Sequence, residues 1–399
     1  MIALLRGLRR AFSPGKNDPL RADAADLLRV GCTIAVAAYH IWQQSWLNPA
    51  FSLFGLRVNL RNQVATGYLG VDLLLMLSGF LLYLPYYAAG HTPDVRGFYR
   101  KRAARILPSY WFCLLIMLAF AAVGGLYASA GAMLRDLLAH ATFTHNLSAE
   151  SYVGTPLNGA LWTLAVEVQF YLIFPLLARV FRRWPVPTYA AMLLISRVFL
   201  SLWVLPREDT TLWFNQLPAL MEVYANGMLA AHIYGALSKR RCESRVEALL
   251  CTLLAVAACA ALWMLSDSQG RLSGYEVVRR GQLARRFPLS AAGAVFVVCG
   301  SRSLSFFRIL CSNRLTRFLS DVSFNFYVWH QVLALKLKQW RVPPYVSDMP
   351  QKAAEQPWQH QYTLLCWLAA LAMAILVTYA VERPCARRML RGRKRKPAN

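Results

Sequence analysis

This chain of 399 residues is 57% hydrophobic and only 16% charged, which is too apolar for an ordinary soluble domain. Its formal net charge of +25 would suit a nucleic-acid-binding protein, but the basic residues are spread between long apolar stretches. Composition therefore excludes a soluble nucleic-acid-binding protein. It predicts an all-α, polytopic membrane protein.

Ten apolar stretches are long enough to cross a bilayer. They lie at residues 27–46, 67–89, 108–128, 160–181, 187–205, 212–235, 246–265, 283–300, 318–336 and 361–381. We expect about ten transmembrane helices around a polar cavity. An even number of crossings places both termini on the same side.

The basic residues predict the orientation. With the amino terminus in the cytoplasm, 29 of the 44 Lys and Arg residues fall in cytoplasmic segments, which is the positive-inside pattern. We expect a multi-pass cell-membrane protein with both termini cytoplasmic. It would comprise a basic amino-terminal segment at 1–26, a transmembrane domain at 27–382 and a basic tail at 383–399.

One predicted outer stretch, residues 266–286, breaks this pattern with five arginines. Two interpretations stay open. The stretch contacts an external polyanion, or the boundary of the following helix is misplaced.

Arg29 and His40 stand in the first apolar stretch. Ionisable residues within a membrane span are costly and usually functional. Eleven positions at about 100° each return to nearly the same helical face, with a rise of about 16 Å. One face therefore carries a cation near the cytoplasm and a titratable base deeper in.

Asp72, Glu167 and His330 come from three other spans and are predicted at the depth of His40. An unpaired charge there costs at least ~2.5 kcal/mol, so the four helices should converge on a polar cavity. We predict that His40 is a general base, oriented by a carboxylate that fixes its tautomer. Glu167 is the favoured carboxylate and Asp72 the other candidate, while Asp72 and His330 could equally be structural partners.

Two further groups have candidate roles. Arg102 and Arg105, three residues apart, would share a helical face and suit phosphate oxygens, unless they serve only the positive-inside pattern. Trp162 and Tyr171 flank Glu167 and, with His330, are predicted to bind the acceptor. The spacing of His, Cys, Asp and Glu predicts no metal site.

The chain resembles the acyltransferase family 3 membrane enzymes at successive motifs. These are DLLR at 26–29 with His40, GVDLLLMLSGF at 70–80, RAARILP at 102–108, LWTLAVEVQFY at 161–171, SFNFYVWH at 323–330 and VERP at 381–384. The resemblance implies transfer of an acyl group, often acetyl, from cytoplasmic acyl-coenzyme A to a hydroxyl of an extracytoplasmic glycan or glycolipid acceptor. It implies that His40 is the essential histidine, with Arg29, Arg102 and Arg105 toward the donor.

Acyl-coenzyme A would be a donor substrate, with no permanently bound cofactor; membrane lipid is the other expected partner. Within this class, direct attack by the acceptor hydroxyl and an acyl-histidine intermediate both stay open. A proton-coupled transporter would also place His, Asp and Glu in one layer, but the internal repeats expected of it are not visible. A non-catalytic membrane sensor is the third class.

Overall fold

The computed structural model describes residues 21–90, 94–239, 244–353 and 356–391. Most of the predicted amino-terminal segment and the end of the basic tail, at 1–20 and 392–399, lie outside these residues.

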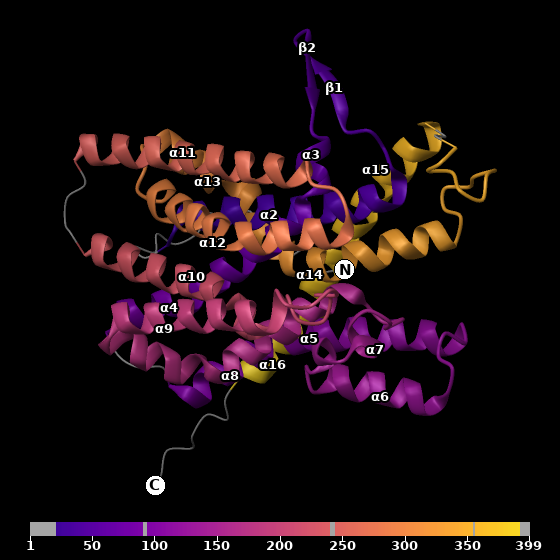
Figure 1. Cartoon of the computed structure of the whole chain (residues 1–399), viewed down its shortest axis with the longest axis horizontal. Helices are drawn as coiled ribbons and strands as arrows, with labels where there is room; N and C mark the ends of the chain where they lie inside the picture. The colour runs from indigo at the N-terminus through magenta and orange to yellow at the C-terminus, as the bar shows by residue number, and fades with distance from the viewer. Residues whose placement is uncertain (1–20, 91–93, 240–243, 354–355, 392–399) are drawn as a thin grey trace.

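Long helices form the body of the molecule (Figure 1). They are α2 (Asp23–Ser45), α4 (Gly70–Ala89), α5 (Val95–Val123), α8 (Trp162–Arg183), α9 (Pro185–Phe199), α10 (Leu217–Ser238), α11 (Arg245–Gly270), α12 (Tyr275–Gly300), α14 (Arg314–Gln339) and α15 (Gln356–Val377).

Short elements connect them. They are a hairpin of β1 (Ala50–Leu53) and β2 (Leu56–Asn59), the helices α3 (Arg61–Ala65), α6 (Ala130–Ala141), α7 (Ala149–Tyr152), α13 (Ser305–Cys311) and α16 (Arg383–Leu390), the 3₁₀ turns η1 (Gly67–Leu69), η2 (His145–Leu147) and η3 (Gly159–Leu161), and the π turns η4 (Leu200–Val204) and η5 (Thr378–Glu382).

Within the described residues, eight helices are long and apolar enough to cross a membrane. The prediction of an all-α, multi-pass membrane protein is therefore confirmed. Helices α10 and α14, with 22 and 26 residues, match the other two predicted spans in position but are not among these eight. The count of about ten stays a prediction.

Glycines allow close packing in the centre of the bundle. A Cβ added at Gly79 of α4 would lie 2.7 Å from the carbonyl oxygen of Tyr224 in α10, and one at Gly227 of α10 would meet the carbonyl oxygen of Met76. Small residues let membrane helices approach until their backbones touch. This pair of glycines lets α10 pack closely against α4.

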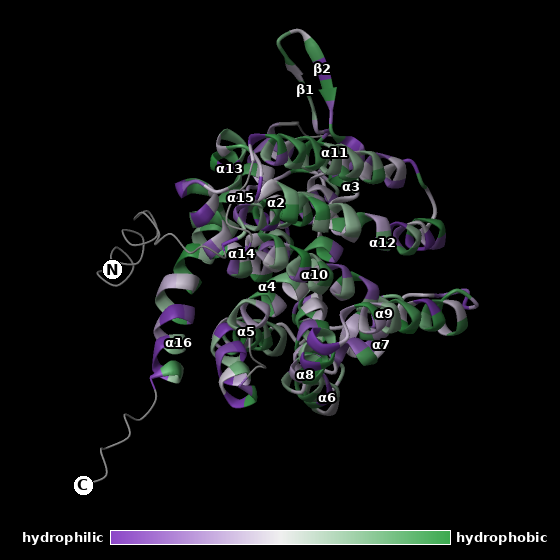
Figure 2. Ribbon diagram, turned by 90° about the vertical axis from the view of Figure 1, so that its left-hand side faces the viewer, coloured by the Kyte–Doolittle hydropathy of each residue, from purple (hydrophilic) through white to green (hydrophobic). Residues whose placement is uncertain are grey.

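The bundle has two chemically different ends. The basic end carries Arg100 to Arg105 in the first half of α5, Arg182 and Arg183 at the end of α8, and the arginines of α16, a largely hydrophilic helix (Figure 2). At the opposite end lie the hairpin and the connection from α5 to α8 that contains α6 and α7 (Figure 1). The basic end is the predicted cytoplasmic side.

The structure decides between the two interpretations of residues 266–286. Helix α11 extends to Gly270 and α12 begins at Tyr275, so four of the five arginines lie in the first turns of α12. The predicted boundary at residue 283 was wrong. Each arginine has a partner within the chain: Arg271 pairs with Asp267, Arg279 with Glu276 and Asp209, Arg280 with backbone oxygens, Arg285 with Ser268, and Arg286 with Asp72. These arginines are committed to the fold, which removes the argument for an external polyanion site.

Candidate active site

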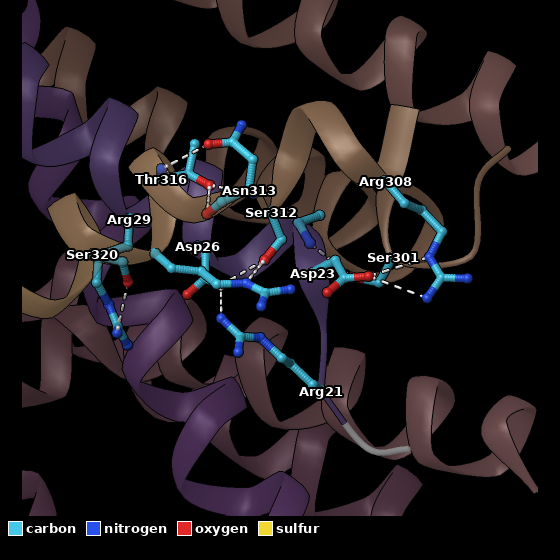
Figure 3. A network of polar contacts seen from close by, with 12 residues as sticks. Arg21, Asp23, Asp26, Arg29, Ser301, Arg308, Ser312, Asn313, Thr316 and Ser320 are labelled. Atoms are coloured by element: carbon cyan, nitrogen blue, oxygen red, sulfur yellow. Dashed lines mark hydrogen bonds and ion pairs between the residues drawn. The ribbon is translucent and has the colours of Figure 1, made fainter. Parts of the chain in front are cut away.

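Helix α2 is fixed at the basic end by a polar network (Figure 3). Asp26 pairs with Arg21 and accepts a hydrogen bond of 3.0 Å from the hydroxyl of Ser312. Asp23 accepts from Arg308 of α13 at 3.1 Å. One turn above Asp26, Arg29 reaches toward the hydroxyl of Ser320 in α14, at 3.4 Å. The network therefore holds Arg29 beside α14.

Helices α2 and α14 run in the same direction and stay in contact along their length. Eleven residues beyond Arg29, His40 contacts His330, which is ten residues beyond Ser320. Nδ1 of His40 lies 2.9 Å from Nε2 of His330, and the ring centroids are 5.0 Å apart. His330 is 1% exposed, whereas His40 is partly exposed. The prediction that these two histidines share one layer is confirmed.

The hydrogen bonds fix the tautomers of the neutral histidine pair. Nδ1 of His330 lies 2.6 Å from the carbonyl oxygen of Tyr327, which only accepts, so this nitrogen must carry a hydrogen. In a neutral ring Nε2 of His330 is then an acceptor, and Nδ1 of His40 must be the donor. The lone pair of His40 is left on Nε2. That nitrogen is the one a general base needs.

A cavity of about 170 Å³ is lined by residues of α2 and α14 that precede this pair, among them Thr33 and Tyr327, and neither histidine is part of its lining. Five helices line it, and its polar wall consists of Arg29 and Thr33 of α2, Ser78 of α4, Arg102 and Arg105 of α5, Thr163, Glu167 and Tyr171 of α8, and Ser323 and Tyr327 of α14. Leucines of α4 make most of the remainder. The cavity therefore combines three cations with one carboxylate between apolar walls.

The predicted common face of Arg102 and Arg105 is confirmed, since both side chains line this cavity. Arg102 lies over the rings of Phe98 and Tyr171, at 5.7 and 5.9 Å, and its Nε is buried without a hydrogen-bond partner. Arg105 pairs with Glu382 of η5. A guanidinium group with a buried donor that has no partner is ready to bind an anion.

Glu167 does not contact His40. Its Oε1 accepts hydrogen bonds from Ser78 at 2.7 Å and from Tyr171 at 2.6 Å, within the arginine-lined part of the cavity. Among the described residues, the side chain within hydrogen-bond distance of His40 is that of His330. The predicted pairing of His40 with a carboxylate is corrected accordingly, because α14 rather than α8 lies against this face of α2.

Asp72 also faces elsewhere. Its carboxylate is 1% exposed and accepts from Nε of Arg286 at 3.1 Å and from Gln282 at 3.3 Å. Arg286 in turn donates to the backbone oxygen of Phe214 and to Asn215. The alternative role, a structural partner, is the one that the structure assigns to Asp72.

The aromatic residues around Glu167 are not one pocket. Tyr171 lines the cavity near Arg102, at the donor end predicted for the arginines. The ring of Trp162 lies instead 6.1 Å from that of Tyr152, outside the cavity lining. The predicted acceptor pocket built from Trp162 and Tyr171 is therefore not formed as expected.

Sequence reasoning missed a link between the cavity and the histidines. Tyr327 lines the cavity and accepts a hydrogen bond of 3.1 Å from Thr163, while its carbonyl oxygen binds His330. Glu382, which holds Arg105, also accepts from Asn325 at 2.6 Å. Tyr327, Thr163, Glu382 and Asn325 all lie in the motif segments quoted above. Membership in these motifs was the one signal by which the sequence could have pointed to them. Their partners depend on tertiary contacts between α8, α14 and η5.

A family model described as an acyltransferase domain matches residues 23–383, and this span includes every residue of the cavity and the histidine pair. The chain belongs to acyltransferase family 3. It is therefore a multi-pass membrane acyltransferase.

Curated relatives are similar over parts of the chain. The exopolysaccharide production protein ExoZ of Rhizobium meliloti (strain 1021) is 28% identical over 66% of this chain and 75% of its own length. The nodulation protein 10 of Rhizobium leguminosarum bv. viciae is 29% identical over 46% of this chain and 50% of its own. The putative peptidoglycan O-acetyltransferase YrhL of Bacillus subtilis (strain 168) is 25% identical over 76% of this chain. The match spans 47% of that relative's length. No solved structure matches.

Proposed function

We propose that this membrane acyltransferase moves an acyl group, acetyl in the first instance, from cytoplasmic acyl-coenzyme A to a hydroxyl of an extracytoplasmic glycan or glycolipid. One observation carries the proposal. A cavity lined by three arginines also contains Tyr327, whose carbonyl oxygen binds His330, and His330 in turn holds His40 with its free lone pair on Nε2.

Binding of the donor is assigned to the basic end. Arg102 and Arg105 stand in the first half of α5, where their guanidinium groups would bind the phosphates of coenzyme A. Glu382 orients Arg105, and Glu167 offsets part of the positive charge of the cavity. The apolar wall of α4 leaves room for the pantetheine arm to pass Arg29. About 16 Å of rise separates Arg29 from His40, which an extended arm spans.

The chemistry needs one base at the far end of that arm. Nε2 of His40 takes the proton of the acceptor hydroxyl, whose oxygen forms the new ester bond to the thioester carbonyl carbon. The carbon–sulfur bond breaks, and the departing thiolate takes the proton back from the imidazolium. His330 keeps Nδ1 of His40 protonated throughout, as an orienting group does in other histidine bases. Holding the two substrates together supplies the remaining catalysis.

The acceptor class is supported by the relatives. Two of them carry peptidoglycan O-acetyltransferase or exopolysaccharide production in their names. His40 is partly exposed and lies in the last turns of α2, the end of this helix that leads into the hairpin. A glycan hydroxyl arriving from that side would meet Nε2 of His40.

The test uses the full chain in lipid nanodiscs with acetyl-coenzyme A and cell-surface glycan. We expect release of free coenzyme A together with a glycan heavier by one acetyl group. His40→Ala should abolish both products while preserving the melting temperature. His360→Ala, outside the cavity lining, is the matched control. Acetylation that persists in His40→Ala would contradict the assignment of the base.

A further inference from the structure

Residues 50–59 form a hairpin that the catalytic assignment does not use. The strands pair Ala50 with Asn59, Phe51 with Val58, Ser52 with Arg57 and Leu53 with Leu56. The turn residues Phe54 and Gly55 have φ values of 49° and 81°, and positive φ at both central residues is typical of a tight type I′ turn. The register of the hairpin is therefore well defined.

This register makes the hairpin amphipathic. Directly paired residues point to the same face, and alternate residues along a strand share a face. One face therefore carries Phe51, Leu53, Leu56 and Val58, while the other carries Ala50, Ser52, Arg57 and Asn59. Leu56 is 73% exposed and the turn residue Phe54 is 97% exposed. An isolated two-stranded hairpin is marginally stable in water, so an exposed apolar face on one indicates a partner.

The hairpin is attached at the membrane boundary. Asn62 of α3, at its base, donates to Asp267 at 2.8 Å, and the hydroxyls of Thr66 and Ser266 lie 2.6 Å apart. Asp267 and Ser266 are in the last turns of α11. From this point the hairpin projects away from the bundle beyond α11, and it runs across the direction of that helix rather than along it (Figures 1 and 2). Because α11 is one of the helices that can cross the membrane, a hairpin that runs across its direction extends along the membrane surface.

The neighbouring surface and the charge of the segment identify the partner. Helix α11 exposes Leu253, Trp263 and Met264, at 58, 52 and 68%, on a helix apolar enough to face lipid. The hairpin therefore continues a lipid-facing surface. Residues 46–66 contain Arg57 and Arg61 and no acidic residue, which suits anionic headgroups.

We propose that the hairpin is an interfacial anchor that lies on the leaflet at the opposite end of the bundle. Its apolar face enters the lipid and its Ser52–Arg57 face meets headgroups and water. This interaction surface is separate from the acyltransferase cavity, and its test needs no turnover.

The experiment places an environment-sensitive fluorescent amino acid at position 56 or, as the matched control on the polar face, at position 52. Each full-length variant is reconstituted with one copy per nanodisc, in anionic lipid whose acyl chains carry bromine as a quencher. We expect about three-fold more quenching at position 56 than at position 52. Less quenching at position 56 is expected in purely zwitterionic lipid.

Equal, weak quenching at both positions would place the hairpin in water and overturn the proposal. A blue shift at position 56 that needs two copies per nanodisc would also overturn it, because a second copy would then cover the apolar face. Equal, strong quenching at both positions would contradict the assignment of the two faces.

Discussion

Replacing His330 by phenylalanine should slow acyl transfer while leaving the binding of acyl-coenzyme A unchanged. Phenylalanine keeps an aromatic ring in this buried position but removes the Nε2 acceptor, 2.9 Å from Nδ1 of His40. The ring of His40 then loses the partner that holds its lone pair on Nε2. A hydrogen bond to a group that becomes charged in the reaction contributes about 1–3 kcal/mol, equivalent to about 5-fold to 150-fold in turnover.

The assay is the steady-state release of coenzyme A, with turnover and the Michaelis constant for the donor measured separately. A positioning role lowers turnover and leaves the donor constant unchanged. His330→Gln provides the matched control, since its amide oxygen can accept from Nδ1 of His40 and should restore part of the rate. Wild-type turnover in His330→Phe, at an unchanged melting temperature, would refute the proposal that His330 orients His40.

Three further predictions concern other parts of the chain. The double substitution Arg102→Ala and Arg105→Ala should weaken coenzyme A binding by roughly 10-fold or more, through loss of charge-assisted hydrogen bonds. If isothermal titration shows an unchanged affinity, both arginines serve only the positive-inside pattern that orients the chain. Asp72→Asn should lower the melting temperature and leave turnover nearly unchanged, because it leaves the buried Arg286 with an uncompensated charge. Normal stability with lost activity would instead assign Asp72 a catalytic role. Burial and the nearby His140 lower the pKa of His145 from its usual 6.5 to about 3. Between these values the unfolded segment binds a proton that the folded one does not, so the α6–α7 connection should lose about 1.4 kcal/mol per pH unit below pH 6.5. Hydrogen exchange of residues 130–158 at pH 7.5 and 5 measures this, and His145→Phe should remove the pH dependence.

The fold was predictable where the sequence pattern is strong and local. Membrane-length apolar stretches located the long helices, because burial in lipid requires continuous hydrophobic runs with satisfied backbones. The ends of the helices were predictable only where the charged residues begin at the end of the helix. The predicted span starts at residue 108, where the apolar run begins, whereas α5 begins at Val95 and carries Arg100 to Arg105 in its first half. The same error at residue 283 created the apparent basic loop.

The candidate site was predictable residue by residue but not pair by pair. Periodicity placed Arg102 and Arg105 on one face, and depth along the helices placed His40 and His330 in one layer. Depth says nothing about which helices are neighbours. The partner of His40 depends on α14 lying against α2, and the partner of Asp72 on Arg286 of α12. These contacts are tertiary, so the sequence could offer the candidates but not choose among them.

The rigid spacing on α2 leads to the last prediction. Arg29 and His40 belong to one helix that is held at both levels by α14, so neither can move toward the other without breaking the Ser320 or His330 contact. The donor must therefore bridge about 16 Å with its own flexible arm. Acetyl-pantetheine, which lacks the phosphates, should require a much higher concentration but reach a similar maximal rate, because its thioester can still approach His40. An acetyl-coenzyme A analogue with a shortened arm and intact phosphates should bind normally and turn over at least about ten-fold more slowly, as expected when reacting groups are held apart. If the shortened donor reacts at the normal rate, the thioester does not need to travel from the arginines to His40, and the two-ended geometry is not the one used in catalysis.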